Sequence, residues 1–129
     1  MACDVLLVED DRATREAIRD VLQDFGLSVQ ATEEGQTALR LMREVSPHVV
    51  LIDLMMPVMN GWQFIETVSA SPELRNIPVV MMTASSTPRP AGCQRLLKKP
   101  FTHTALESAL SPFVGQLPRS GISHPPHGG

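Results

Sequence analysis

The chain alternates short apolar runs with longer segments in which apolar residues recur every three or four positions. The runs are rich in Val, Leu and Ile, and they lie at residues 5–8, 27–31, 48–53 and 79–82. Short continuous apolar runs are typical of parallel strands that are buried on both faces. The alternation therefore predicts strands that are joined by helices.

The segments between the runs predict amphipathic helices, because their apolar residues fall on one side of a helix. The three inner faces expected from this spacing are Ile18, Val21, Leu22 and Phe25; Ala38, Leu41, Met42 and Val45; and Trp62, Phe64, Ile65 and Val68. We expect the first helix to end near Gly26, and the second to be capped at Thr32 and to stop before Pro47. A last helix is expected after Thr102, with an inner face of Leu106, Ala109 and Leu110.

A chain of 129 residues and 14.1 kDa has room for one ordinary domain. Strands that alternate with helices in such a chain predict an α/β doubly wound parallel sheet, with right-handed crossovers that place helices on both faces. We expect the domain to cover residues 1–115. Residues 116–129 are rich in Pro, Gly and His, and we expect a flexible tail there.

Charge and hydropathy exclude several classes of protein. The net charge is −3, the pI is near 5.7, and there is no basic stripe with interleaved aromatic residues, so nucleic-acid binding is not expected. The apolar runs are too short to span a membrane, and the N-terminus lacks a signal-peptide pattern. Cys3 and Cys93 have no close metal-ligand spacing, which favours free thiols. These features predict a cytoplasmic protein that binds neither nucleic acid nor membranes.

Polar side chains stand at the ends of four apolar runs. Glu9 and Asp10 follow the first run, Asp53 ends the run at 48–53, Thr83 follows the run at 79–82, and Lys99 follows a Leu-Leu pair. The carboxyl ends of parallel strands share one edge of a sheet, and open α/β sheets bind their ligands there. We therefore expect these side chains to lie close together although they are far apart in the sequence.

The residue types in this group are suited to phosphoryl chemistry. Carboxylates packed at one place repel each other unless a cation lies among them, and a hard divalent ion with oxygen ligands fits such a group. Mg2+ fits better than zinc, because no Cys or His belongs to the group. An ionised aspartate beside Mg2+ can form an aspartyl phosphate, while a lysine and a hydroxyl contact the phosphoryl oxygens.

The four strand ends resemble those of the receiver domains of two-component response regulators, which are also called CheY-like domains. The resemblance covers about residues 4–110. It rests on the motifs Leu-Leu-Val-Glu9-Asp10-Asp, Val-Val-Leu-Ile-Asp53-Leu-Met-Met-Pro57-Val-Met-Asn-Gly61, Val-Val-Met-Met-Thr83-Ala84 and Leu-Leu-Lys-Lys99-Pro100-Phe101. The resemblance implies a flavodoxin-like sheet of five parallel strands in the order 2-1-3-4-5.

The resemblance also implies a phosphoacceptor and a metal site. Asp53 matches the phosphoacceptor, and Glu9 and Asp10 match the acids that bind Mg2+ together with Asp53. The backbone carbonyl of Met55 would complete the protein ligands of the metal. Asp11 lies one place beyond the matching pair of acids, so we interpret it as a helix cap.

Two further roles come from the same resemblance. Thr83 would supply the switch hydroxyl, and Lys99 would contact the phosphoryl group. We choose Lys99 over Lys98 because the lysine of the family directly precedes the proline, and the bond between Lys99 and Pro100 is expected to be cis.

The segment between Thr83 and Lys99 departs from the family pattern. It is short and carries Pro88 and Pro90 where receivers have a helix, so we expect that helix to be absent or replaced by a loop. Leu96 stands where typical receivers often have an aromatic residue, and Pro112 is expected to break the last helix. One hypothesis is that phosphorylation orders the loop from Thr83 to Gln94 through the hydroxyl of Thr83, as an order-disorder switch and not as a shift of a helix.

The sequence therefore predicts a single-domain response regulator that catalyses only its own phosphorylation and dephosphorylation. Its phosphoryl donor would be a sensor histidine kinase or a histidine phosphotransfer protein, with Mg2+ as cofactor, and its output would be contact with another protein. The alternative is a receiver-like interaction module that works without phosphorylation. A phosphatase of the haloacid dehalogenase type is disfavoured, because Met55 stands where such enzymes place a second aspartate.

Overall fold

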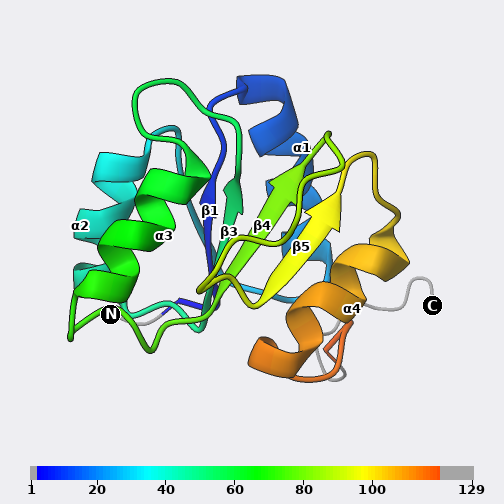
Figure 1. Ribbon diagram of the computed structural model, residues 1–129. Helices are drawn as coiled ribbons and strands as arrows, with labels where there is room; N and C mark the ends of the chain where they lie inside the picture. Colours follow the sequence, from blue (N-terminus) through cyan, green and yellow to red (C-terminus); the bar gives the residue numbers. More distant parts are fainter. Residues whose placement is uncertain (1–2, 120–129) are drawn as a thin grey trace.

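A computed structural model describes residues 3–119 and shows five strands and four helices within that range. The elements alternate along the chain until the fourth strand, which is followed directly by the fifth (Figure 1). In chain order they are β1 (Val5–Val8), α1 (Arg12–Asp24), β2 (Val29–Thr32), α2 (Gly35–Val45), β3 (Val49–Asp53), α3 (Gly61–Ala70), β4 (Val79–Thr83), β5 (Arg95–Lys98) and α4 (His103–Val114).

All five strands are parallel and lie in the order β2-β1-β3-β4-β5. The predicted flavodoxin-like topology is therefore confirmed. The direction of winding reverses between β1 and β3, and open α/β sheets bind their ligands at the carboxyl ends of the strands beside such a point. β1, β3 and β4 are buried along their whole length, as expected for strands covered on both faces.

Two apolar layers hold the sheet between its helices. On one face, α2 and α3 pack against alternate strand residues such as Leu6 and Ile52, and on the other face α1 and α4 pack against Leu7 and Leu51. Figure 1 shows the two pairs of helices on opposite sides of the sheet. Because successive side chains of a strand point to opposite faces of the sheet, the core is divided into two layers.

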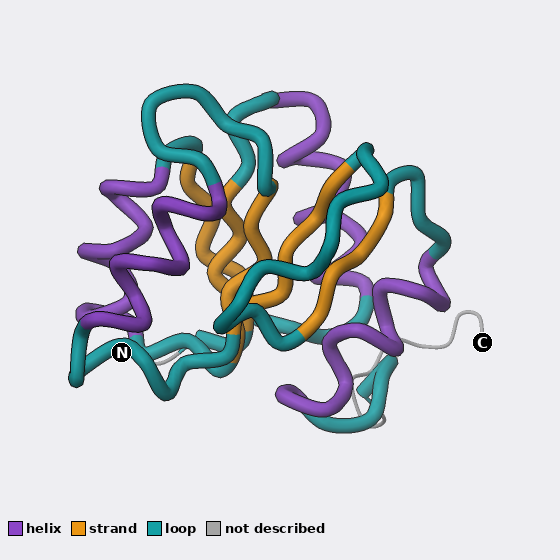
Figure 2. Tube along the Cα trace, viewed as in Figure 1, coloured by secondary structure: helices purple, strands orange, loops and turns teal. Residues whose placement is uncertain are grey.

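The connection between β4 and β5 contains no helix. Residues 84–94 run back along the sheet as an extended loop (Figure 2), and buried Pro90 and Cys93 anchor that loop on the face that α3 covers. The predicted loss of a helix here is confirmed. Gly92 has a φ of +90°, and a Cβ there would lie 2.8 Å from the hydroxyl of Ser69, so the backbone passes close to α3.

A shallow groove of about 620 Å³ lies beside this loop. Trp62 lines it together with Pro90, Ala91 and Gly92, and 40% of the Trp62 side chain is exposed. The prediction that Trp62 lies on the inner face of its helix is therefore wrong. No helix lies between β4 and β5 to cover this part of α3, and the loop leaves Trp62 partly exposed.

Three expected boundaries also differ. The second strand begins at Val29 instead of Leu27, because the amide of Leu27 still bonds to the carbonyl of Leu22 at the end of α1. Thr32 belongs to β2, and Glu34 is the N-cap residue of α2 without a side-chain capping bond.

Pro112 does not break the last helix. α4 continues through Pro112 to Val114, and a proline so near the helix end removes one backbone bond while Leu110 and Val114 stay packed in the core. Leu117 packs against the same core, and Arg119 bonds to Asp4 at 2.7 and 3.0 Å. The domain boundary at residue 115 stays a prediction, and most of the predicted tail lies outside the described residues.

Candidate functional site

The carboxyl ends of β1, β3, β4 and β5 place the predicted site residues at one edge of the sheet. Asp53 ends β3 and is paired in register with Met82, so Thr83 lies one residue further along the neighbouring strand. The amide of Lys99 donates to the carbonyl of Thr83 at 2.7 Å, which ties the segment after β5 to the same edge. Backbone pairing therefore brings together residues that are distant in the chain.

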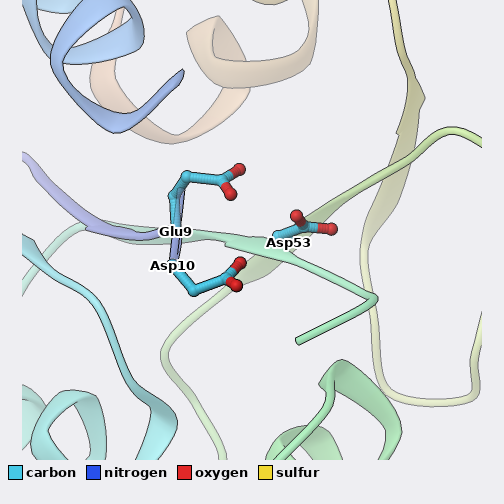
Figure 3. A group of neighbouring side chains, drawn as sticks. All are labelled: Glu9, Asp10 and Asp53. Carbon is cyan, nitrogen blue, oxygen red and sulfur yellow. The ribbon is translucent and has the colours of Figure 1, made fainter. Parts of the chain in front are cut away.

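Three carboxylates gather at this edge. Glu9, Asp10 and Asp53 each offer an oxygen, and these oxygens lie within 4.8 Å of one another. Figure 3 shows the three carboxyl groups directed toward a common space. Glu9 is 1% exposed and Asp53 7%, whereas Asp10 is exposed to solvent. The expected acidic group is therefore formed, with one member that water and ions can reach.

Lys99 lies between two of these acids. Its Nζ is 3.2 Å from Oδ2 of Asp53 and 3.1 Å from Oε1 of Glu9. Lys98 points elsewhere and donates to the hydroxyl of Ser86 at 3.2 Å. Of the two adjacent lysines, only Lys99 contacts the carboxylates.

Burial and charge perturb the ionisation of Glu9 and Lys99. Burial raises the pKa of Glu9, the nearby Asp53 carboxylate adds to this, and the bonds from Lys99 and from the Asp11 amide oppose it. Burial alone would lower the pKa of Lys99, but the bond to Glu9 and the charges of Asp53 and Glu9 outweigh burial, so that pKa is raised. Lys99 thus stays an ammonium beside the acids at neutral pH.

Local turns fix the acidic side chains. Asp53 accepts a bond from the backbone amide of Met55 at 3.0 Å, which orients one oxygen and leaves the other for Lys99. Met55 itself is 59% exposed. Ligation of a metal by the carbonyl of Met55 stays a prediction.

Asp11 is the N-cap of α1. It accepts bonds from the amide of Thr14 at 2.9 Å and from its hydroxyl at 2.6 Å, which confirms its interpretation as a cap. Asp11 therefore caps a helix, whereas Glu9 and Asp10 belong to the acidic group.

Another cap lies after the Asp53 loop. Asn60 and Gln63 form a capping box that begins α3.

Two groups of contacts were not predicted from the sequence. The guanidinium of Arg15 donates to the carbonyl of Glu9 at 2.8 Å and so supports the loop that carries the acids. The hydroxyl of Thr83 lies 3.1 Å from that of Ser85, which lies 2.5 Å from the hydroxyl of Thr87. The spacing Thr-x-Ser-x-Thr was the available signal for this second group.

The donor set fits a magnesium ion. Carboxylate oxygens are the ligands that Mg2+ prefers, and the three acids converge without a Cys or His among them. If all three acids are ionised, the single ammonium of Lys99 leaves an excess of negative charge that a divalent cation would neutralise.

The sequence matches the model of the family described as "Response regulator receiver domain" over residues 5–111. This chain belongs to the response regulator receiver family. Receiver domains are signalling modules that work with histidine kinases, and the match covers every strand and most of α4. The resemblance of the strand ends to those of receiver domains is therefore confirmed.

Named relatives agree with this family. The polar-differentiation response regulator DivK of Brucella ovis is 28% identical over 121 residues, which cover 89% of this chain and 98% of the relative. The DivK protein of Brucella anthropi is 28% identical over 117 residues, 86% of this chain and 95% of that protein.

Solved structures share the fold. The chemotaxis response regulator CheY4 of Vibrio cholerae has a TM-score of 0.77 and 28% identity, over 88% of this chain and 99% of that chain. The receiver domain of a sensor histidine kinase from Pseudomonas aeruginosa has a TM-score of 0.80 and 25% identity, over 90% of this chain and 100% of that chain. That structure carries a magnesium ion coordinated in its active site cleft.

Residues 3–119 contain no helix of the length and hydrophobicity that a membrane crossing requires. Cys3 and Cys93 are free thiols, as expected, and Cys93 is buried. The peptide bond between Lys99 and Pro100 is cis, as the resemblance implied.

Proposed function

We propose that this protein accepts a phosphoryl group on Asp53 from a phosphohistidine of a sensor histidine kinase or of a histidine phosphotransfer protein. Mg2+ is the cofactor, and the signal passes to another protein by direct contact. The observation that carries the proposal is the position of Asp53, whose Oδ2 lies 3.2 Å from the Lys99 ammonium inside a group of three carboxylates.

The reaction needs a nucleophile, a route for electrons and compensation of charge. An oxygen of the Asp53 carboxylate attacks phosphorus, the bond between phosphorus and the histidine nitrogen breaks, and its electron pair returns to the imidazole. Lys99 is placed to contact a phosphoryl oxygen as a point charge, and the hydroxyl of Thr83 can donate to another. These roles follow the family pattern and the geometry of the strand ends.

Glu9, Asp10, Asp53 and the carbonyl of Met55 are the groups that would hold the metal. Bound Mg2+ supplies positive charge that offsets the repulsion between the acids and an incoming phosphoryl group. Arg15 and the Asp11 cap hold the loop that presents Glu9 and Asp10. The protein acts in the cytoplasm under this proposal, and isolated thiols such as Cys3 and Cys93 remain reduced there.

Intact mass measured after incubation with acetyl phosphate and Mg2+ tests the proposal. The wild type should gain one phosphoryl group, and Asp53→Asn should gain none. An equal gain in both proteins would place the acceptor elsewhere. Asp20→Asn is the matched control, since Asp20 is an exposed aspartate on α1.

A second candidate is a receiver-like interaction module that works without phosphate. The helix-free connection of residues 84–94 favours it, because this part of the output surface departs from the family pattern. The same mass measurement separates the two functions. A wild-type protein that binds its partner but takes up no phosphoryl group with Mg2+ would support the second candidate.

A further inference from the structure

A row of three hydroxyls leads from the site into the helix-free loop. The hydroxyl oxygens of Thr83 and Ser85 lie 3.1 Å apart, and those of Ser85 and Thr87 lie 2.5 Å apart. Thr83 is 1% exposed, Thr87 is half-buried and Ser85 is exposed. The row therefore begins in the buried edge of the sheet beside Asp53 and ends in the segment 84–94.

Ser85 competes for the hydrogen-bonding capacity of the Thr83 hydroxyl. The Thr83 oxygen already accepts a bond from the backbone amide of Ser85 at 3.1 Å. A hydroxyl has one hydrogen, so Thr83 can donate either to the Ser85 oxygen or to an acceptor at Asp53, but not to both. When Thr83 donates toward Asp53, Ser85 can donate to Thr83 instead, and the same reversal can pass on to Thr87.

The first part of the loop has few other ties to the site. Lys98 donates to Ser86 at 3.2 Å, and Arg89 donates to the carbonyl of Cys93 further along. Buried Pro90 and Cys93 fix the second half of the loop against the core. The hydroxyl row thus joins the buried end of β4 to the exposed first half of the loop.

We propose that Ser85 is a positioning residue for the Thr83 hydroxyl, and that the row Thr83–Ser85–Thr87 transmits phosphorylation of Asp53 to residues 84–94. This inference rests on the proposed function for its trigger. A phosphoryl oxygen on Asp53 is a stronger acceptor than the Ser85 hydroxyl, so it draws the Thr83 hydrogen. The direction of donation then reverses along the row, and hydrogen-bonded chains respond as a unit.

An ordinary turn is the simpler interpretation, because a Thr hydroxyl often accepts from the amide two residues later. Such a turn explains the contact between the Ser85 amide and Thr83. It does not require the additional contacts between the Ser85, Thr83 and Thr87 hydroxyls, and it predicts no response of the loop to phosphate.

The first experiment needs no phosphate. Amide hydrogen exchange of residues 84–94 is measured in the wild type, in Thr83→Val, in Ser85→Ala and in the double variant. If the two hydroxyls act through each other, the double variant should lose no more protection than either single variant. Additive losses would overturn the link between Ser85 and Thr83, whatever the protein does with phosphate.

The second experiment uses acetyl phosphate and Mg2+ in excess, with the modified fraction read from the intact mass. Compared at equal modification, the wild type should change its exchange in residues 84–94, and Ser85→Ala should show a change at least threefold smaller. Ser85→Thr keeps a hydroxyl and should restore the response. Ser86→Ala, which loses only the contact with Lys98, should respond like the wild type.

The outcomes separate the two proposals. A full loop response in phosphorylated Ser85→Ala, or no loop response in phosphorylated wild type, would overturn transmission through the row while the function of Asp53 stands. A wild type that gains no phosphoryl group would overturn the proposed function and its trigger. In that case the first experiment still decides whether Ser85 positions Thr83.

Discussion

The Nζ atom of Lys99 lies 3.2 Å from Oδ2 of Asp53, although 46 positions separate the two residues in the chain. The contact depends on three neighbouring parallel strands, because β3 carries Asp53, β5 leads to Lys99, and β4 lies between them. One predicted nucleophile and one predicted cation are therefore positioned by backbone pairing and not by a local motif.

Replacement of Lys99 should slow phosphorylation. Lys99→Ala removes a charge beside the attacking carboxylate, and the loss of one such stabilising group typically costs about 100-fold in rate. The rate of mass gain with acetyl phosphate and Mg2+ measures this effect. Lys98→Ala is the matched control and should stay near the wild-type rate, since Lys98 contacts Ser86 and no carboxylate of the site. Equal slowing by both variants would contradict the choice of Lys99.

Mg2+ should stabilise the folded protein through the acidic group. A ligand that binds only the folded state raises the melting temperature. At a ligand concentration of 100 times its Kd, the free energy of unfolding rises by about 2.7 kcal/mol. Thermal unfolding with and without Mg2+ should show this rise in the wild type and lose it in Asp10→Asn, whose side chain is exposed and can be changed without disturbing the core. Chelation by EDTA should reverse the rise. A rise of the same size in Asp10→Asn would remove Asp10 from the metal site.

Arg119 should stabilise the domain through Asp4. The two side chains form two bonds of 2.7 and 3.0 Å, and Ser28 donates two more to Asp4. Arg119→Ala should lower the free energy of unfolding by about 1–2 kcal/mol at pH 7, after allowance for the partial exposure of the pair. Chemical denaturation measures the loss, and Arg19→Ala on the exposed side of α1 should cost little.

The contribution of Arg119 to the free energy of unfolding should disappear in acid. Burial alone would raise the pKa of Asp4, but bonds from Arg119 and Ser28 outweigh it and hold that pKa below its ordinary value of 3.8. A carboxyl with a lowered pKa stabilises the fold above its unfolded-state pKa and loses that contribution as pH falls through the lowered value. The gap between wild type and Arg119→Ala should therefore stay constant at neutral pH and narrow below about pH 3.8. A gap that is independent of pH down to full protonation would contradict the ion pair.

Val58 is a site where stability can be gained. Its φ is +68°, in the left-handed region where β-branched residues are strained, and its side chain is 93% exposed. Val58→Asn should raise the free energy of unfolding by about 1 kcal/mol, since Asn adopts this conformation more easily. Val58→Thr keeps the branch at Cβ while adding polarity, so it should bring no comparable gain. Equal stability of both variants would show that polarity alone matters.

Much of the fold follows from the spacing of apolar residues and from the order of strands and helices along the chain. The fully buried runs of β1, β3 and β4 identified three strands, and strict alternation with helices fixed a parallel sheet with its site at the carboxyl edge. The acids and Lys99 were found because they lie at the end of a strand or within two residues after it. Pro88 and Pro90 correctly indicated the loss of a helix, because both residues oppose helical hydrogen bonding.

Other features depend on tertiary context. Trp62 has a helical spacing that matches its apolar neighbours, and only the absence of a covering helix exposes it. Pro112 is tolerated because the surrounding helix is held by buried Leu110 and Val114. Val58 has a positive φ, although it is neither Gly nor Asn, the residues that usually adopt one. The bond from Arg15 to the carbonyl of Glu9 matches no sequence motif, so the sequence did not predict it.

Trp62 is the single tryptophan of the chain, and it faces the connection of residues 84–94 in the groove beside α3. Because indole emission responds to the water around the ring, movement of that connection would alter the colour and intensity of the protein's own fluorescence. The missing helix has thereby created a built-in optical reporter, which can follow the loop in real time without any attached dye.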